Sequence, residues 1–288
     1  RAAMRRDRRR QGGGVNLLVG ILLGAVQGLT EFFPVSSSAH LVLIQVLIPS
    51  FEQPGVFFDA VLHLGTVFSV LYFLRREIAA LLLSLVSPRD RNLPGGEADG
   101  FRESGRRIIL LLLVGTAITA AVGLTFKDSI HDLFRSVETT AAALLVTGML
   151  LLLADRIKTP GRTERDLSFT DAVIIGIAQS VALVPGISRS GSTIAFGIFR
   201  KLSRETAARF SFLLSVPAVL GAAILESRYA TAVPVADWPV YLAGFLAAAG
   251  SGFVALKVLF TVLNRRGLSV FAYYCWAVGV LTLVFRAL

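Results

Sequence analysis

Residues 24–40 read Gly24-Ala-Val-Gln-Gly-Leu-Thr-Glu-Phe-Phe-Pro-Val-Ser-Ser-Ser-Ala-His40 and place a polar break between two apolar segments. The segments on either side, residues 15–29 and 41–48, are each shorter than the roughly 20 residues that a helix needs to cross a membrane. Pro34 ends or kinks a helix because it lacks a backbone N–H and clashes with the preceding turn. We therefore predict a helical hairpin that enters the membrane and returns, with irregular backbone lining a cavity.

A second break of the same kind separates residues 172–184 from residues 191–199 and reads Pro185-Gly-Ile-Ser-Arg-Ser-Gly191. The two breaks resemble each other in sequence. Gly24 and Gln27 recur 152 residues later as Gly176 and Gln179, and Pro34 recurs 151 residues later as Pro185.

This recurrence predicts an internal repeat, with repeat 1 covering about residues 15–154 and repeat 2 about residues 170–288. Because an odd number of predicted spans separates the two hairpins, they are expected to enter the membrane from opposite faces. Broken helices at matching positions of two inverted halves are the best sequence indicator of a binding site near the middle of the bilayer.

The composition of the remaining chain is that of a membrane protein. Of 288 residues, 54% are hydrophobic and 17% are charged, and the mean hydropathy is +0.69. These values exclude a soluble globular protein, a disordered chain and a nucleic-acid-binding protein. The long apolar runs predict six spanning helices, over residues 56–74, 108–126, 139–154, 207–225, 239–264 and 270–288.

The predicted fold is therefore all-α and integral to the membrane, an inverted-topology repeat with six spanning helices and two re-entrant helix hairpins. Residues 15–288 form a single membrane domain, preceded by a disordered basic tail at residues 1–14. Residues 87–107 have the composition of a loop. The single cysteine, Cys275, lies in an apolar run and is expected to be a buried small hydrophobe.

The net charge of +10 is explained by membrane topology rather than by a nucleic-acid partner. Seventeen Lys and Arg residues lie in the loops on one predicted face, and four lie on the other. The positive-inside rule makes the first face cytoplasmic. The six basic residues of the N-terminal tail disagree, but the adjoining hairpin does not cross the membrane. The first hairpin is then expected to open to the outside.

The polar residues at the two breaks are the candidates for chemistry, since polar side chains within a membrane are costly. Gln27 and Glu31 share one helix face. In the second break Arg189 is flanked by serines, and an Arg with hydroxyls and loop amides suits a phosphate group. We predict a site with Glu31, Ser37, His40 and Arg189 in catalysis and with substrate contacts from Gln27, Ser36, Ser38, Ser188 and Ser190.

Structural roles compete with these functional ones. Arg189 could form a salt bridge with Glu31 that holds the hairpins together, the serines could cap helices, and His40 could simply be packed. His63, one turn after Asp59, is a weaker candidate that either supports the site or pairs within its own helix.

The two motifs, residues 24–40 and Pro185-Gly-Ile-Ser-Arg-Ser-Gly-Ser-Thr193, closely resemble the bacterial undecaprenyl-diphosphate phosphatase family of the bacitracin-resistance type. Residues 210–217 and the repeat layout extend the resemblance over nearly the whole chain. It implies an enzyme of the bacterial inner (plasma) membrane that converts C55 polyprenyl diphosphate to the monophosphate and recycles the cell-wall lipid carrier. It also implies a divalent cation, Mg²⁺ or Ca²⁺, and a homodimer.

Carried over residue by residue, the family's Glu, essential Ser, His and Arg fall on Glu31, Ser37, His40 and Arg189. The first acidic position of its Glu/Gln-x-x-x-Glu pattern is Gln27 here, so that one carboxylate, Glu31, remains as a metal ligand. A further Asp of the family falls on Asp166, which the sequence alone places in a loop or helix cap.

The resemblance and the residues together favour phosphoryl transfer from the lipid diphosphate, with the apolar helices holding the polyprenyl tail. The attacking group is left open between Ser37, His40 and water, with Ser37 as nucleophile and His40 as base preferred. The alternative function is an inverted-repeat transporter or flippase for the polyprenyl phosphate.

Overall fold

The computed structural model describes residues 17–47, 56–86, 97–133, 136–158, 161–265 and 267–287. Within these ranges the chain is helical, and the β-type pairing they contain is an isolated bridge between Arg162 and Leu202. The all-α prediction is confirmed. The predicted disordered tail at residues 1–14 lies outside the described residues.

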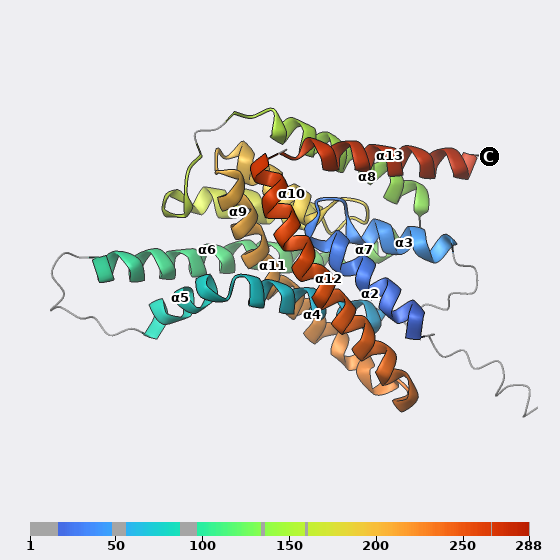
Figure 1. The fold of residues 1–288 in the computed structure, drawn as a ribbon. Coiled ribbons are helices and arrows are strands. Elements are labelled where there is room, and N and C mark those ends of the chain that lie inside the picture. The colour runs from blue at the N-terminus through green and yellow to red at the C-terminus, as the bar shows by residue number, and fades with distance from the viewer. Residues whose placement is uncertain are drawn as a thin grey trace, which may run out of the picture.

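The helices assemble into one bundle around a shared apolar core (Figure 1). Helix α5 and the first turns of α6 lie at one end of the bundle, and α7 and the C-terminus lie at the other (Figure 1). The helices are α2 (Leu17–Phe32), α3 (Ser37–Leu47), α4 (Val56–Phe73), α5 (Arg75–Val86), α6 (Glu97–Thr125), α7 (Lys127–Leu133), α8 (Val137–Asp155), α9 (Phe169–Val181), α10 (Arg189–Phe199), α11 (Arg204–Glu226), α12 (Trp238–Arg265) and α13 (Ser269–Ala287), with short 3₁₀ turns at Glu164–Asp166, Ser227–Ala232 and Val235–Asp237.

Five of the described segments are long and apolar enough to cross a membrane, namely Ser104–Thr125, Val137–Asp155, Arg204–Thr231, Val235–Arg265 and Ser269–Arg286. The remaining predicted span, over residues 56–74, is not a simple crossing. Helices α4 and α5 meet at an angle of 79° and together could form one bent span. The structure therefore supports five or six crossings where the sequence predicted six.

The prediction of a loop over residues 87–107 is wrong in its second half. Helix α6 begins at Glu97, and residues 87–96 lie outside the described part of the chain. Arg106 stabilises this polar part of α6, because its guanidinium donates to the carbonyl oxygens of Ser84 and Leu85 at the end of α5. The charges indicated a loop, whereas here they join two helices.

Both predicted breaks are present, and each separates two short helices. Helices α2 and α3 flank the first break, and α9 and α10 flank the second. Helix α3 starts four residues earlier than predicted, at Ser37, because Ser36 accepts a hydrogen bond from the backbone N–H of Ala39 and so acts as a cap. The serine cluster thus forms the start of a helix rather than a loop.

Each broken helix packs against a spanning helix from the other half of the chain. Helix α2 packs along α12, while α9 packs along α6. Glycines permit both close approaches: a Cβ on Gly24 would lie 2.2 Å from the carbonyl oxygen of Gly244, and one on Gly176 would lie 2.8 Å from the Cα of Gly115. The glycines of α2, spaced four residues apart at Gly20, Gly24 and Gly28, therefore serve helix packing.

Candidate functional site

The carboxylate of Glu31, in the last turn of α2, is the centre of the polar site. Its Oε1 accepts a hydrogen bond of 2.5 Å from Nη2 of Arg189. Its Oε2 accepts one of 2.7 Å from Oγ of Ser37 and one of 2.8 Å from Nε2 of Gln27. Four predicted site residues from the two breaks thus meet within hydrogen-bonding distance.

Helix geometry explains why these side chains converge. Gln27 and Glu31 lie one turn apart on the same face of α2. Ser37 and Arg189 are the first residues of α3 and α10, so both breaks direct an N-terminal helical residue at the same carboxylate. The fully buried Phe32 packs edge-on against Phe212 of α11, with ring centroids 5.5 Å apart, and anchors the end of α2.

The remaining predicted serines build the turns rather than contact Glu31. Ser188 caps α10 by accepting from the backbone N–H of Gly191 at 3.0 Å, which confirms the capping role for this residue. Hydroxyl pairs two residues apart recur in both breaks: Ser36 with Ser38 at 3.1 Å, and Ser188 with Ser190 at 3.3 Å. The two breaks are thus alike in local structure as well as in sequence.

One terminal nitrogen of Arg189 is hydrogen-bonded, and the other lacks a partner among the described residues. The Glu31 salt bridge considered from the sequence is present through Nη2. Its other terminal nitrogen, Nη1, is buried and has no hydrogen-bonding partner among the described residues. An unpartnered guanidinium N–H is costly in a dry site unless a ligand satisfies it. The salt bridge therefore accounts for only part of what this side chain can bind.

His40 lies apart from the Glu31 cluster. Its Nδ1 is 2.8 Å from the carbonyl oxygen of Ser36, and its Nε2 is 2.8 Å from the hydroxyl of Tyr274 in α13. Both ring nitrogens are engaged away from Ser37. The preferred assignment of His40 as the base for Ser37 is therefore not supported by this geometry, because Ser37 donates to Glu31 instead.

His63 belongs to the site, although the sequence ranked it as a weak candidate. Its Nε2 lies 3.6 Å from Oε2 of Glu31, while Nδ1 donates to the carbonyl oxygen of Asp59 at 2.8 Å. Both roles considered from the sequence are therefore present. The sequence signal was a histidine one turn after Asp59 in an apolar helix, which does not reveal that α4 lies beside α2.

The side chains around Glu31 offer few ligands for a hard divalent cation. No group of three or more His, Cys, Asp or Glu side chains gathers anywhere in the part of the chain that the structure describes. Oε1 of Gln27, however, is buried beside Glu31 without a hydrogen-bonding partner among those residues. A carbonyl oxygen and a carboxylate are ligands that Mg²⁺ and Ca²⁺ accept, with water or phosphate completing the shell.

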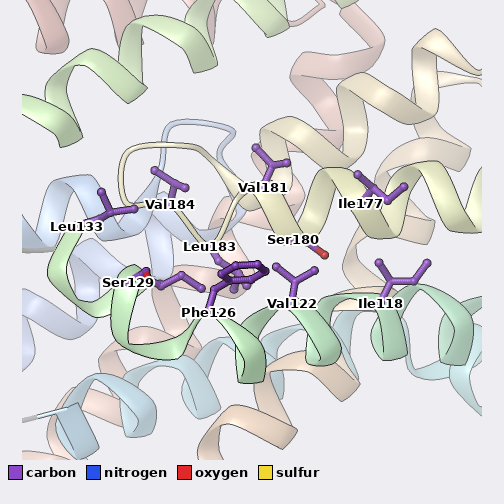
Figure 2. Close-up of a pocket in the computed structure, with 11 residues that line it drawn as sticks. Ile118, Val122, Phe126, Ser129, Leu133, Ile177, Ser180, Val181, Leu183 and Val184 are labelled. Atoms are coloured by element: carbon purple, nitrogen blue, oxygen red, sulfur yellow. The ribbon is translucent and has the colours of Figure 1, made fainter.

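An apolar cavity of about 400 Å³ lies beside the second break (Figure 2). Side chains from α6, α7 and α9 point into it, together with residues of the turn after α9 (Figure 2). Its lining is Ile118, Val122, Phe126, Ser129, Ile130, Leu133, Ile177, Ser180, Val181, Leu183 and Val184. An elongated apolar group is the kind of ligand that such a surface accepts.

Asp166 has the capping role that the sequence indicated. Its carboxylate accepts hydrogen bonds from the backbone N–H of Thr163 at 2.8 Å and from the Thr163 hydroxyl at 3.0 Å. The Thr163 backbone holds the pKa of Asp166 below its usual value. A neighbouring carboxylate that the sequence reasoning missed, Asp171, is fully buried and pairs with Arg162 and Arg200 at the base of α9 and α10.

Comparison with known sequences supports the interpretation of the two motifs. The family profile described as bacitracin resistance protein BacA matches residues 20–281. The chain is 44% identical to an undecaprenyl-diphosphatase of Syntrophotalea carbinolica, with 92% of this chain and 97% of that protein covered. It is 38% identical to an undecaprenyl-diphosphatase of Methanosphaera stadtmanae and 40% identical to one of Carboxydothermus hydrogenoformans, with at least 94% of each chain covered. The chain belongs to the bacitracin resistance protein BacA family.

Proposed function

We propose that this protein is an undecaprenyl-diphosphatase, which hydrolyses the terminal phosphate of the lipid diphosphate and leaves the monophosphate in the membrane. The family and the names of its relatives support this activity. The structural observation that carries it is the convergence of Ser37 and Arg189 on Glu31, with a buried Arg189 nitrogen left for a phosphate oxygen.

In the proposed reaction Ser37 is the nucleophile and Glu31 the base. Ser37 Oγ attacks the terminal phosphorus while its proton passes to Oε2 of Glu31, which already accepts that hydrogen bond. The bond from this phosphorus to the bridging oxygen breaks, and polyprenyl monophosphate leaves. Water then attacks the phosphorus of the phosphoserine, and the bond from phosphorus to Oγ breaks. Ser37 Oγ takes back the proton held by Glu31, and inorganic phosphate leaves with the hydrogens of the water. Direct attack by water, with Glu31 as base, is the alternative that trapping experiments distinguish.

Arg189 binds the phosphate in this proposal through the nitrogen that the salt bridge leaves free. Nη2 remains on Glu31, and Nη1 donates to an oxygen of the transferred phosphoryl group, where negative charge is stabilised during transfer. The planar guanidinium can make both contacts at once. Substrate contacts from the hydroxyls of Ser36, Ser38, Ser188 and Ser190 remain a prediction.

A divalent cation, when bound, would neutralise charge on the diphosphate oxygens. The carboxylate of Glu31 and Oε1 of Gln27 are the protein groups that would hold it. With a single carboxylate, these residues would supply only part of the ligands that such a cation needs. Gln27 also orients Glu31 directly through its Nε2.

The membrane location explains the rest of the architecture. The multi-pass helical bundle suits a lipid substrate whose tail lies among apolar side chains, and the cavity lined by α6, α7 and α9 is a suitable surface for part of that tail. We infer that the two breaks are re-entrant hairpins of an inverted repeat, supported by the matched packing of α2 on α12 and of α9 on α6. The basic loops orient the site of this inner-membrane protein toward the outside.

Phosphate release by the purified protein tests this function. Wild-type protein in detergent, given polyprenyl diphosphate and Mg²⁺ or Ca²⁺, is expected to release phosphate, and EDTA is expected to abolish release. Ser37→Ala should lower kcat by about 100-fold or more, whereas Ser227→Ala, at an exposed helix end, should not. A flippase without hydrolytic activity would instead move the labelled lipid across vesicles and release no phosphate with any metal.

Trapping distinguishes the nucleophile. Acid quenching during turnover should leave phosphoserine at Ser37 in the wild type, and mass spectrometry would locate it. Phosphate release without any phosphoserine, combined with an active Ser37→Ala variant, would assign the attack to water.

A further inference from the structure

Helix α13 contacts the first break through one face. Phe271, Tyr274 and Cys275 follow the i, i+3, i+4 spacing that places side chains together on a helix. The ring of Phe271 lies 5.5 Å from that of Phe33, the Tyr274 hydroxyl is 2.8 Å from Nε2 of His40, and the buried thiol of Cys275 points at the carbonyl oxygen of Pro34 at 3.7 Å.

His40 connects this face of α13 to the serines. A carbonyl oxygen can only accept a hydrogen bond, so Nδ1 of His40 carries the proton that is donated to Ser36. In the neutral ring Nε2 is then an acceptor, and the Tyr274 hydroxyl supplies its hydrogen. The two rings also stack, with 5.6 Å between their centroids and 6° between their planes.

Ser36 is the residue in need of such support. Its φ of +66° lies in the left-handed region, which is unfavourable for a residue with a Cβ. Such a conformation persists where the surroundings determine it. The backbone N–H and the Nδ1–H of His40 both donate to the Ser36 carbonyl, and the next residue, Ser37, begins α3 with its hydroxyl on Glu31.

We propose that Tyr274 is a positioning residue of this enzyme: its hydroxyl orients the His40 ring, which holds Ser36 in its left-handed conformation and thereby directs Ser37 at the reacting phosphate. This rests on the proposed function of Ser37. Tyr274 is the residue through which α13, in the second half of the chain, acts on the chemistry of the first hairpin.

The second break has a support of the same kind, which agrees with this role. The hydroxyl of Thr147, in α8, donates to the carbonyl oxygen of Gly186 and accepts from the backbone N–H of Ser188, both at 3.0 Å. Gly186 has a φ of +95°. In each half, then, the last spanning helix holds a left-handed turn in the other half, one residue before Ser37 in the first break and three residues before Arg189 in the second.

Tyr274→Phe tests the proposal, with Tyr273→Phe as the matched control. Both substitutions remove one hydroxyl from neighbouring, exposed positions of α13, and Tyr273 packs against Trp276 instead of the first break. We expect Tyr274→Phe to lower kcat for phosphate release about two- to tenfold, with KM unchanged, because one hydrogen bond that aims the nucleophile is lost. Equal kcat values for the two variants would overturn the proposal.

A double-mutant cycle shows whether Tyr274 acts through His40. In the background of His40→Ala, adding Tyr274→Phe should cause no further loss of kcat, because the route to Ser36 is already broken. Multiplicative losses would assign Tyr274 a separate, packing role and contradict the proposal.

A spectroscopic measurement makes the test independent of turnover. The chain contains three histidines, so protein with ¹⁵N-labelled histidine has few signals, and His40 is assigned by its loss in His40→Ala. At pH 8, above the usual histidine pKa of about 6.5, His40 should have a protonated Nδ1 and an unprotonated Nε2. The Nε2 resonance should shift in Tyr274→Phe and remain in Tyr273→Phe. A shift with unchanged kcat rejects positioning, whereas an active Ser37→Ala rejects the proposed nucleophile.

Discussion

At the residue scale, the proposed chemistry depends on how the two oxygens of one carboxylate are shared. Oε1 of Glu31 is engaged by Arg189, and Oε2 accepts from Ser37 and Gln27. A carboxylate paired with Arg on one oxygen remains ionised, and its second oxygen is then a base within reach of a serine proton. The same guanidinium that holds Glu31 has a second buried nitrogen for the substrate.

Replacing Arg189 by Lys tests whether both guanidinium nitrogens are needed. An ammonium group is compact and cannot hold Glu31 and a phosphate oxygen in the same planar fork. We expect kcat/KM to fall by about 100-fold or more, the usual loss for a stabilising donor. Steady-state phosphate release measures this, with Arg286→Lys, an exposed residue at the end of α13, as control. Retention of full activity in Arg189→Lys would mean that a single positive charge suffices.

Gln27 is the residue to change for the cation. Gln27→Glu would add a second carboxylate one turn from Glu31, and ligand charge strongly affects affinity for hard cations. We expect the half-saturating concentration of Mg²⁺ to fall about tenfold. The matched control is Gln179→Glu, the counterpart in α9, whose Nε2 donates to Thr119. A metal dependence that is the same in both variants would place the cation away from Gln27.

At the scale of helices, the site requires that the short helices α2 and α9 end close together, so that the two breaks meet. Helices α2 and α9 are held at close range by glycine contacts with α12 and α6, and α10 is tied to α11 by a hydrogen bond between the hydroxyls of Thr193 and Ser211. These contacts lie in apolar surroundings, where van der Waals packing rather than the hydrophobic effect drives helix association. Small residues therefore determine where Glu31 and Arg189 lie.

Gly24→Ala should loosen this packing. The new Cβ would lie 2.2 Å from a backbone oxygen of Gly244, so the helices would have to separate. We expect a destabilisation of about 1–3 kcal/mol, visible as a lower apparent melting temperature in detergent. Gly250→Ala in α12 is the control, because its Cβ would meet no atom within 4 Å. Equal melting temperatures would show that the contact at Gly24 does not limit stability.

The whole molecule is defined by its topology in the membrane, which the distribution of charge predicts. In a Cys275→Ser background, a cysteine at Glu164, in the basic loop before α9, should resist an impermeant thiol reagent applied to intact cells. One at Ala236, in the turn before α12, should react. Both positions are exposed, and both should react after permeabilisation. Labelling of Glu164→Cys in intact cells would reverse the orientation.

Much of this architecture was predictable because the membrane restricts what a sequence can form. Apolar runs without charge have to be helical, and a proline beside a cluster of polar residues marks each break, at Pro34 and Pro185. Proline alone is not sufficient, because Pro217 lies inside the continuous helix α11. The same restriction identified Glu31 and Arg189, since charges beside such breaks are costly unless they have a function. The prediction failed over residues 97–107, where charges that suggested a loop instead join α5 to α6.

The amino-acid pattern was sufficient for the helical class, the two breaks and the residue types of the site, because these follow from local polarity and backbone sterics. Which atoms meet was decided by tertiary packing alone. Nothing local indicates that α4 carries His63 to Glu31, that Ser37 donates to that carboxylate, or that α13 turns His40 toward Tyr274. The contact between His40 and Tyr274 joins segments 234 residues apart in opposite halves of the chain, whereas the contacts of Glu31 with His63 and Ser37 come from the packing of helices within the first half.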